Sequence, residues 1–399
     1  MSIDDSILAS APTGRAPAVL QVLPALVSGG AERGTVELAG ALVEAGWTSY
    51  VASAGGPLER DVARAGATHL TLPLASKNPL VMRRNATALV RLIRQLGIDI
   101  LHARSRAPAW SACAAARATG RPFVTTFHNV YGAHTALKRR YNSIMARGDR
   151  VIAISHFVAD HAASLYGVGL DRLRTIPRGV DLESFDPNRV GAQRMVNLAR
   201  QWRLPDGMPV VMLPGRLTRW KGGIDFIAAV AKLGRRDICC VLAGSEQHHG
   251  FRREIEAAIR ASGLAGPFRI VEECRDMPAA YMLADVVVSA SREPEGFGRV
   301  IVEAQAMGRP VVATDHGGAR ETIVQGITGW LAPPRDPAAL AAAIAEALSL
   351  AAEERQQLAH RAMAHVADRF TSRAMCAGTI RVYEELLFRK SRDIDIAAQ

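Results

Sequence analysis

The chain has 399 residues, of which 49% are hydrophobic, 22% charged and 5% aromatic, and its formal net charge is +11. This composition is typical of a globular protein with large cores and excludes an intrinsically disordered chain, while the length exceeds that of one ordinary domain. The five cysteines lack the paired short spacings of zinc or disulfide frameworks, so a reducing, cytoplasmic setting is expected. No run approaches the roughly 18 apolar residues of a membrane span, and residues 1–17, expected to be a flexible tail, do not resemble a secretory signal.

Over residues 18–187, short runs rich in Val and Ile alternate with helical patterns, which is typical of parallel βαβ units. The expected strands are Ala18–Leu23, Thr48–Ser53, Ile98–His102, Phe123–Phe127, Val151–Ile154 and Leu173–Ile176. Helices are expected between them, including Glu32–Glu44 and Leu80–Leu96. Turn-forming clusters between 178 and 208 interrupt the alternation, so the sequence predicts a domain boundary there, after residue 187.

A second series of the same kind covers residues 188–371. Its expected strands are Pro209–Leu213, Ile238–Leu242, Phe268–Val271, Val286–Ser289, Pro310–Ala313 and Gly329–Leu331. Asp336 and Pro337 predict the N-cap and first turn of a helix, and a last helix over 372–390 is expected to complete the first domain. The predicted fold class is α/β, with two doubly wound Rossmann-like domains facing a central cleft, and such sheets bind ligands at the carboxyl ends of their strands.

Two segments carry groups suited to binding anions and hydroxyls. Glycines flank Phe297 between an expected strand and a helix, so the backbone and the helix N-terminus can approach an anion, while Glu303 on that helix can accept hydrogen bonds from vicinal hydroxyls. Earlier in the chain, Arg216 and Lys221 lie in a glycine-flanked loop that follows an expected strand, where they can bind a diphosphate. Either segment could instead be an ordinary helix start or a charged βα loop.

Residues 19–383 resemble the family 4 glycosyltransferases, retaining enzymes of the GT-B fold. The resemblance rests on Glu295 and Glu303, which match the family's E-x7-E motif, and on Arg216 and Lys221, which match its R-x4-K pair. Further matches are the loop Ser28-Gly29-Gly30-Ala31-Glu32-Arg33, His128 at a strand end, and the turn Gly179-Val180-Asp181.

The resemblance implies a role for each matching residue. It assigns donor binding to Gly29, Gly30, Gly296, Phe297, Gly298 and Glu303. It assigns catalysis to His128, Arg216, Lys221 and Glu295. It assigns acceptor binding to Glu32 and Arg33. It also implies front-face substitution, in which the leaving phosphate takes the acceptor's proton. Arg178 and Glu272-Glu273 depart from the family pattern. Because Glu272-Glu273 lie near the expected base pocket, the resemblance does not identify the base, and the donor can be a UDP- or a GDP-sugar.

No Asp-x-Asp motif follows a core strand, so no metal or other cofactor is expected, and protein cations would stabilise the departing diphosphate. Three alternatives remain open. A sugar-nucleotide epimerase of the same fold would need acid and base carboxylates beside the sugar, and a dinucleotide oxidoreductase would need G-x-G-x-x-G after the first strand. A basic nucleic-acid-binding protein would need interleaved aromatic residues, so no nucleic acid partner is expected.

Residues 1–190 carry 22 basic and 14 acidic groups, a net charge of +8. Arg84, Arg91 and Arg94 can share one face of an expected helix, and Lys138-Arg139-Arg140 form a second cluster. Such faces can rest on an anionic membrane or be ordinary solvated surface. The first reading predicts peripheral association with the inner face of the cytoplasmic membrane and a glycan or glycolipid acceptor, as in lipopolysaccharide or other cell-surface glycan synthesis.

Overall fold

The computed structural model describes residues 15–397 except for 28, 133, 247–249, 265 and 273, and it describes side chains up to residue 388. The chain forms two compact units: unit 1 comprises Met1–Ile176 with Arg373–Gln399, and unit 2 comprises Pro177–Ser372. Three features singled out in the sequence, namely most of the N-terminal tail, Ser28 and Glu273, lie outside the described residues.

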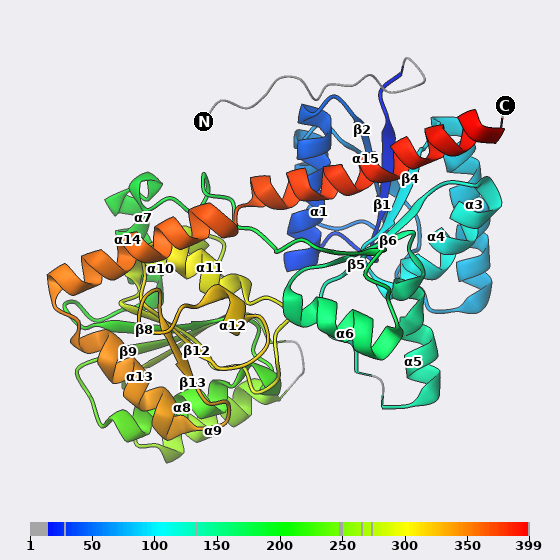
Figure 1. The fold of residues 1–399 in the computed structure, drawn as a ribbon. Helices are drawn as coiled ribbons and strands as arrows, with labels where there is room; N and C mark the ends of the chain where they lie inside the picture. The colour runs from blue at the N-terminus through cyan, green and yellow to red at the C-terminus, as the bar shows by residue number, and fades with distance from the viewer. Residues whose placement is uncertain are drawn as a thin grey trace. The chain divides into compact units, whose positions relative to one another are not determined.

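Unit 1 contains a parallel sheet with the strand order β3-β2-β1-β4-β5-β6-β7 (Figure 1). The strands are β1 (Ala18–Val22), β2 (Thr48–Ser53), β3 (Thr68–Thr71), β4 (Ile100–Ala103), β5 (Phe123–Phe127), β6 (Arg150–Ala153) and β7 (Leu173–Thr175). The helices are α1 (Gly30–Glu44), α2 (Glu59–Arg64), α3 (Pro79–Leu96), α4 (Arg106–Thr119), α5 (Ala136–Asn142), α6 (His156–Tyr166) and α15 (Ser372–Ala397).

The direction of winding reverses between β1 and β4, because β1 continues outward to β2 while β4 continues the other way to β5. The backbone N–H of Arg104, the first residue after β4, donates to the carbonyl of Val22 at 3.0 Å, so both strands end at the same level. The loops that follow them diverge at this point. Unit 1 therefore has its topological switch point, where doubly wound sheets bind ligands, between β1 and β4.

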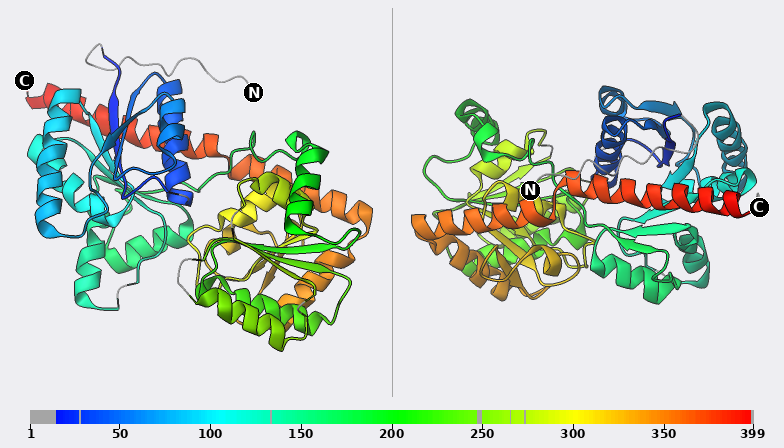
Figure 2. Two further views of the ribbon diagram at one scale, coloured as in Figure 1. Left: turned by 180° about the vertical axis from the view of Figure 1, so that it is seen from behind. Right: turned by 45° about the horizontal axis from the view of Figure 1, so that its top comes forward.

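Helix α15 returns to unit 1 and packs with α1 on one face of the sheet. Both views in Figure 2 show this helix, in red, running along unit 1. The buried Leu38 and Leu42 of α1 share a core with Tyr383 and Leu386 of α15. The hydroxyl of Tyr383 lies 2.6 Å from Nδ1 of His102 on β4. The last helix is thus part of the core of unit 1.

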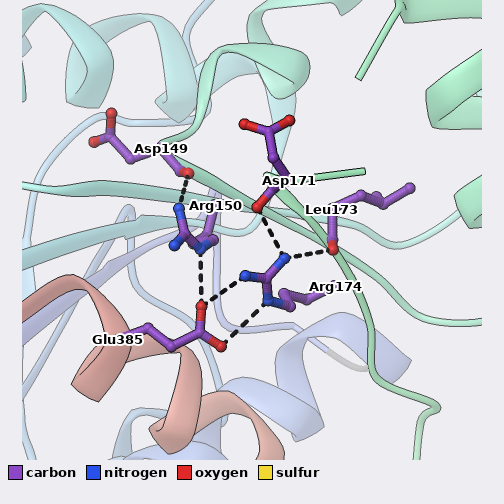
Figure 3. Close-up of polar contacts among 6 residues, drawn as sticks. All are labelled: Asp149, Arg150, Asp171, Leu173, Arg174 and Glu385. Atoms are coloured by element: carbon purple, nitrogen blue, oxygen red, sulfur yellow. Dashed lines mark hydrogen bonds and ion pairs between the residues drawn. The ribbon is translucent and has the colours of Figure 1, made fainter. Parts of the chain in front are cut away.

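An ion-pair cluster fixes α15 to two strands of this sheet (Figure 3). The guanidinium of Arg150 at the start of β6 donates from Nε to Glu385 Oε2 at 2.9 Å, and Arg174 on β7 donates to the same oxygen from Nη2 at 2.8 Å. Arg174 Nε reaches the other carboxylate oxygen at 3.2 Å. One carboxylate of α15 therefore neutralises two arginines of the sheet.

Unit 2 repeats the plan with the parallel strand order β10-β9-β8-β11-β12-β13. Its strands are β8 (Val210–Pro214), β9 (Cys239–Ala243), β10 (Phe268–Val271), β11 (Val286–Ser289), β12 (Val311–Thr314) and β13 (Trp330–Ala332). Its helices are α7 (Ala192–Trp202), α8 (Gly223–Leu233), α9 (Phe251–Ala261), α10 (Met277–Leu283), α11 (Arg299–Ala306), α12 (Ala319–Thr322), α13 (Pro337–Ser349) and α14 (Ala352–Arg369).

Helices α8, α9 and α13 cover one face of the second sheet (Figure 1) and share its largest described core. The carboxylate of Asp336 accepts hydrogen bonds from the N–H groups of Ala338 and Ala339, so the predicted N-cap of α13 is confirmed. The winding reverses between β8 and β11, which places the switch point of this unit at the carboxyl ends of these two strands.

The units divide between Ile176 and Pro177, ahead of the expected boundary at residue 187. The reason is pairing in the segment after the division: Val180 forms a parallel bridge with Thr371 and donates its N–H to the carbonyl of Phe370 at 2.9 Å. A Cβ on Gly179 would overlap the backbone of Thr371, so the turn Gly179-Val180-Asp181 serves close backbone packing within unit 2.

Candidate active site

The central contact of unit 2 joins Lys221 to Glu295 at the switch point of its sheet. Lys221 follows β8 and Glu295 follows β11, and these strands are neighbours whose carboxyl ends meet. The Lys221 ammonium donates to Glu295 Oε1 at 2.7 Å, and the Ser291 hydroxyl donates to the same oxygen. The side chains of Lys221 and Glu295 are 15% and 18% exposed, so solvent still reaches the pair.

The surroundings of Glu295 keep its carboxylate ionised. Burial by itself would raise the pKa of Glu295, but the charge and hydrogen bond of Lys221, helped by Ser291 and by the nearby ring of His316, lower the pKa below its usual value. The Lys221 ammonium also lies 4.6 Å from the centre of the Trp220 ring. The site therefore holds opposite charges side by side, ready to bind a ligand with both anionic and hydroxyl groups.

Glu303 lies on α11, and neighbouring side chains fix its carboxylate. The buried hydroxyl of Tyr281 on α10 donates to Oε2 at 2.8 Å, and Arg299 Nε donates to Oε1 at 3.1 Å. Each carboxylate oxygen has two lone pairs, so both oxygens can accept a further hydrogen bond. This oriented carboxylate is suited to a pair of vicinal hydroxyls.

Between these acids, the loop that leads into α11 brings backbone close to the site. Gly298, the N-cap of α11, has φ 86°, a left-handed conformation that favours glycine. The Phe297 side chain is 3% exposed and packs edge-on against Phe370 at 5.5 Å, so only its backbone is available to a ligand. Gly318 donates its N–H to the carbonyl of Glu295 at 2.9 Å, and a Cβ there would overlap Phe297, so Gly317-Gly318 supports the loop structurally.

Arg216 lies two residues after the end of β8 and is exposed. Its guanidinium has no hydrogen bond or ion pair within the part of the chain that the structure describes. By contrast, Arg219 in the same loop pairs with Glu254 on α9. Arg216 is therefore a cation whose hydrogen-bonding capacity is unused among the described residues, in the same loop as Lys221.

In unit 1, Gly29 and Gly30 open α1 after β1, at the switch point of that sheet. The carboxylate of Glu32 in the first turn folds back toward Gly29, where a Cβ would overlap it. Arg33 is exposed. These residues lie at the carboxyl edge of the sheet, as the sequence predicts.

His128 follows β5 at the same edge and is half-buried. Its backbone is hydrogen-bonded to the buried phenol of Tyr131, whose ring stacks on Phe127 at 5.1 Å. The guanidinium of Arg106 lies 4.4 Å from the centre of the Tyr131 ring. An aromatic and cationic stack thus supports the loop that carries His128.

Three supporting residues of these sites were missed by sequence reasoning: Tyr281, Ser291 and Tyr131. The hydroxyls of Tyr281 and Ser291 hold Glu303 and Glu295, respectively, and Tyr131 holds the backbone of His128. Tyr281 lies on a different helix from its partner, so no local pattern links the two. For Ser291, its position four residues before Glu295 in the same loop was a usable signal.

Comparison with known proteins agrees with this geometry. Residues 28–184 match the family model described as Glycosyltransferase Family 4, and residues 208–350 match the model described as Glycosyl transferases group 1. The D-inositol 3-phosphate glycosyltransferase of Xylanimonas cellulosilytica is 33% identical over 201 residues, which are 50% of this chain and 48% of that protein. The matched part of the chain thus spans about half the length of this curated relative.

Solved structures match over more of the chain. A glycosyltransferase from Rickettsia africae is 37% identical, with a TM-score of 0.86 and coverage of 93% of this chain and 99% of that one. An Anabaena protein crystallised with UDP and glucose is 22% identical, with a TM-score of 0.82 and coverage of 92% and 100%, which shows the shared fold. With its two Rossmann-like units and these matches, the chain belongs to the family 4 glycosyltransferases, which have the GT-B fold.

Proposed function

We propose that this protein transfers a sugar from a UDP- or GDP-sugar to an acceptor hydroxyl, with retention of configuration and without a metal ion. The observation that carries the proposal is the Lys221 and Glu295 pair at the β8/β11 switch point, with Glu303 on the helix that follows. Unit 2 is the donor-binding unit in this proposal. The family membership favours transfer over epimerisation, dinucleotide redox chemistry and nucleic acid binding.

In the proposed complex, Lys221 and Arg216 bind the diphosphate, and Glu303 binds the ribose. The ammonium of Lys221 has three N–H donors, so it can keep Glu295 and still reach a phosphate oxygen. Glu295 and the amides of Gly296 to Gly298 hold the sugar. During transfer, the two cations stabilise the charge that develops on the leaving diphosphate, and the diphosphate accepts the acceptor's proton.

The choice of base is supported by the Anabaena protein, whose crystal structure is described as a complex with UDP and glucose. UDP is therefore the first nucleotide to test. A thermal-shift series with UDP, GDP and their sugar conjugates identifies the donor, because a ligand that binds only the folded protein raises its apparent stability. Absence of any shift, together with absence of sugar-nucleotide hydrolysis, would contradict the proposal.

With the identified donor, activity should survive excess EDTA, because protein cations and helix amides supply the charge stabilisation that a divalent ion gives elsewhere. The measurement is initial rate with and without EDTA, with the anomeric configuration of the product read by NMR. Complete loss of turnover that Mg²⁺ or Mn²⁺ restores would overturn the metal-independent mechanism, and an inverted product would overturn retention.

We further propose that the acceptor is a lipid-linked or lipopolysaccharide-type glycan at an anionic membrane surface. In α3, Arg83, Arg84, Arg91 and Arg94 are exposed while Leu89 and Ile93 are buried. The short helix α5 exposes 79% of Leu137 next to three exposed cations, Lys138-Arg139-Arg140. An exposed apolar residue among cations is suited to the interface of an anionic bilayer. Within residues 15–397, gaps excepted, no helix is both long and apolar enough to cross a membrane.

Vesicle sedimentation tests this surface. Each cation near an anionic bilayer contributes about 1 kcal/mol, so replacing Lys138, Arg139 and Arg140 together by alanine should lower the partition coefficient on anionic vesicles about 100-fold at low salt. Charge reversal of the exposed Arg200 on α7 in unit 2 is the matched control and should have little effect. Equal binding of the wild type to anionic and neutral vesicles at low salt would contradict the membrane proposal and leave the transferase assignment standing.

A further inference from the structure

Arg104, the first residue after β4, is a buried cation that no carboxylate neutralises among the described residues. It is only 5% exposed, and the one hydrogen bond of its side chain within that part of the chain runs from Nη1 to the side-chain oxygen of Gln21 at 3.3 Å. Its Nε is buried and finds no acceptor among the same residues. Placing a charge away from water is unfavourable unless an opposite charge and hydrogen bonds compensate for it.

Arg150, in the same sheet, shows how this unit satisfies a buried arginine that has a structural role. It is also 5% exposed, yet it donates to Glu385 at 2.9 Å and to the backbone carbonyl of Asp149 at 2.9 Å (Figure 3). The two arginines have equal exposure and differ in their partners. The missing counter-charge at Arg104 therefore indicates a role other than holding the fold together.

The surroundings of Arg104 leave its positive charge largely uncompensated. Burial lowers the pKa of Arg104, and more distant groups, among them Tyr383, Glu37 and Glu32, only partly oppose this effect. A guanidinium nevertheless stays protonated inside proteins. Burial and the charge of Arg104 hold the pKa of His102, two residues earlier, well below its usual value, which favours the neutral ring. A net positive charge thus persists where water screens it poorly.

This charge is located at the switch point of unit 1, because Arg104 begins the loop after β4 and its side chain contacts Gln21 on β1. The Glu32 carboxylate that acts on it lies in the first turn of α1, next to Gly29. The N-terminus of α1, a helix of 15 residues, adds a partial positive charge at the same edge. The buried guanidinium and the helix terminus both favour a ligand anion there.

We propose that Arg104 is a specificity residue that makes unit 1 select an acceptor bearing a phosphoryl group, bound at the carboxyl edge of β1 and β4. A phosphoryl dianion gains more from a poorly screened cation than a carboxylate does, and it accepts hydrogen bonds from a guanidinium in a forked arrangement. This inference rests on the proposed transferase function, in which unit 1 binds the acceptor.

The test uses the full chain and inorganic phosphate as the probe. Substituting Arg216 and Lys221 by alanine first removes the two cations proposed to bind the diphosphate in unit 2, so that phosphate can no longer bind to them. In that background, phosphate should raise the Tm above the value in sodium chloride and in acetate of equal ionic strength. Adding Arg104→Met should abolish the phosphate response, and persistence of the response would overturn the proposal, as would its absence in the background variant itself.

The Tm without phosphate is the second readout. Because Arg104 is charged, buried and without a carboxylate partner among the described residues, Arg104→Met should leave the Tm unchanged or raise it. Arg150→Met is the matched control: it should lower the Tm and keep the phosphate response. A fall in Tm for Arg104→Met as large as that for Arg150→Met would assign Arg104 a structural role instead.

One further outcome distinguishes phosphate binding at Arg104 from binding at a second basic surface of unit 1. A groove of about 580 Å³ at the amino ends of β5 and β6 is lined by five arginines, namely Arg117, Arg121, Arg147, Arg150 and Arg172. Phosphate bound in this groove would still raise the Tm of Arg104→Met but would raise that of Arg150→Met less, and this pattern would count against the proposal. Hydrolysis of a sugar nucleotide by the wild type tests the transferase function independently of phosphate. If the wild type hydrolyses a sugar nucleotide but Arg104→Met keeps its phosphate response, the transferase proposal stands and the proposed selectivity for a phosphoryl acceptor is rejected.

Discussion

Replacing Lys221 with methionine is expected to lower kcat about 10²- to 10³-fold, the usual cost of removing one group that stabilises developing charge in a transition state. The side chain lies at the β8/β11 switch point with its ammonium 2.7 Å from Glu295, and it is partly shielded from water there. The effect on kcat should exceed the effect on donor affinity, because the diphosphate gains negative charge as the sugar leaves. Steady-state kinetics and calorimetry with the donor measure the two separately.

Arg219→Ala is the matched control for Lys221→Met. Arg219 is a cation two residues away on the same short helical turn, but its side chain is 67% exposed and pairs with Glu254 on α9. Its loss should change kcat by less than about fivefold, because an exposed pair contributes at most about 1 kcal/mol. Equal losses in the two variants, or a loss in Lys221→Met that follows a fall in Tm, would remove Lys221 from the proposed catalytic group.

Much of the fold could be predicted from the sequence, because most strands are buried on both faces. Phe123–Phe127 and Val286–Ser289 were predicted with the bounds that the structure shows, since short apolar runs between helices have few alternatives in an α/β protein. Strand β3 (Thr68–Thr71) was missed. It lies at the edge of the sheet and reads Thr-His-Leu-Thr, with no fully buried residue, so its hydrophobic pattern is too weak to identify it.

The candidate donor site was predicted from motifs, whereas the contacts that orient it were not. A resemblance to a family names Glu303 and Lys221, but it does not show that Tyr281, 22 residues earlier in the chain, holds the carboxylate of Glu303. Hydrogen bonds between distant elements depend on how helices dock, which no local periodicity encodes. The same holds for Arg104, whose missing counter-charge becomes visible only when its neighbours in space are known.

No local pattern in the sequence indicates how α15 is held to unit 1 either, since Glu385 is 235 residues from Arg150. Glu385→Gln should lower stability at pH 7 by about 2 kcal/mol, between the cost of losing an exposed pair and that of leaving a buried charge unpaired. The Glu385 side chain is 37% exposed, which reduces the effect, but the Arg150 side chain is 6% exposed and would lose its only described carboxylate partner. For a unit of this size the loss corresponds to about 4–8 °C in Tm.

The pH dependence of this loss identifies its cause. Burial alone would raise the pKa of Glu385, but hydrogen bonds and charges from Arg174 and Arg150 lower it. A carboxyl whose pKa falls on folding stabilises the protein above its unfolded pKa of about 4.3 and loses that contribution as the pH drops through the folded value. The Tm difference between wild type and Glu385→Gln should therefore have its full size at pH 7 and shrink toward zero below about pH 4.

The neighbouring Glu384→Gln is the matched control for this last experiment, because burial raises the pKa of Glu384 and so disfavours its ionised form in the folded protein. Glutamine at that position should leave the Tm at pH 7 unchanged or slightly higher. Thermal unfolding of both variants from pH 3 to pH 8 distinguishes the two glutamates. If Glu385→Gln unfolds at the same temperature as Glu384→Gln at pH 7, or if its deficit does not depend on pH, the ion pairs of Figure 3 do not fix α15 to the sheet.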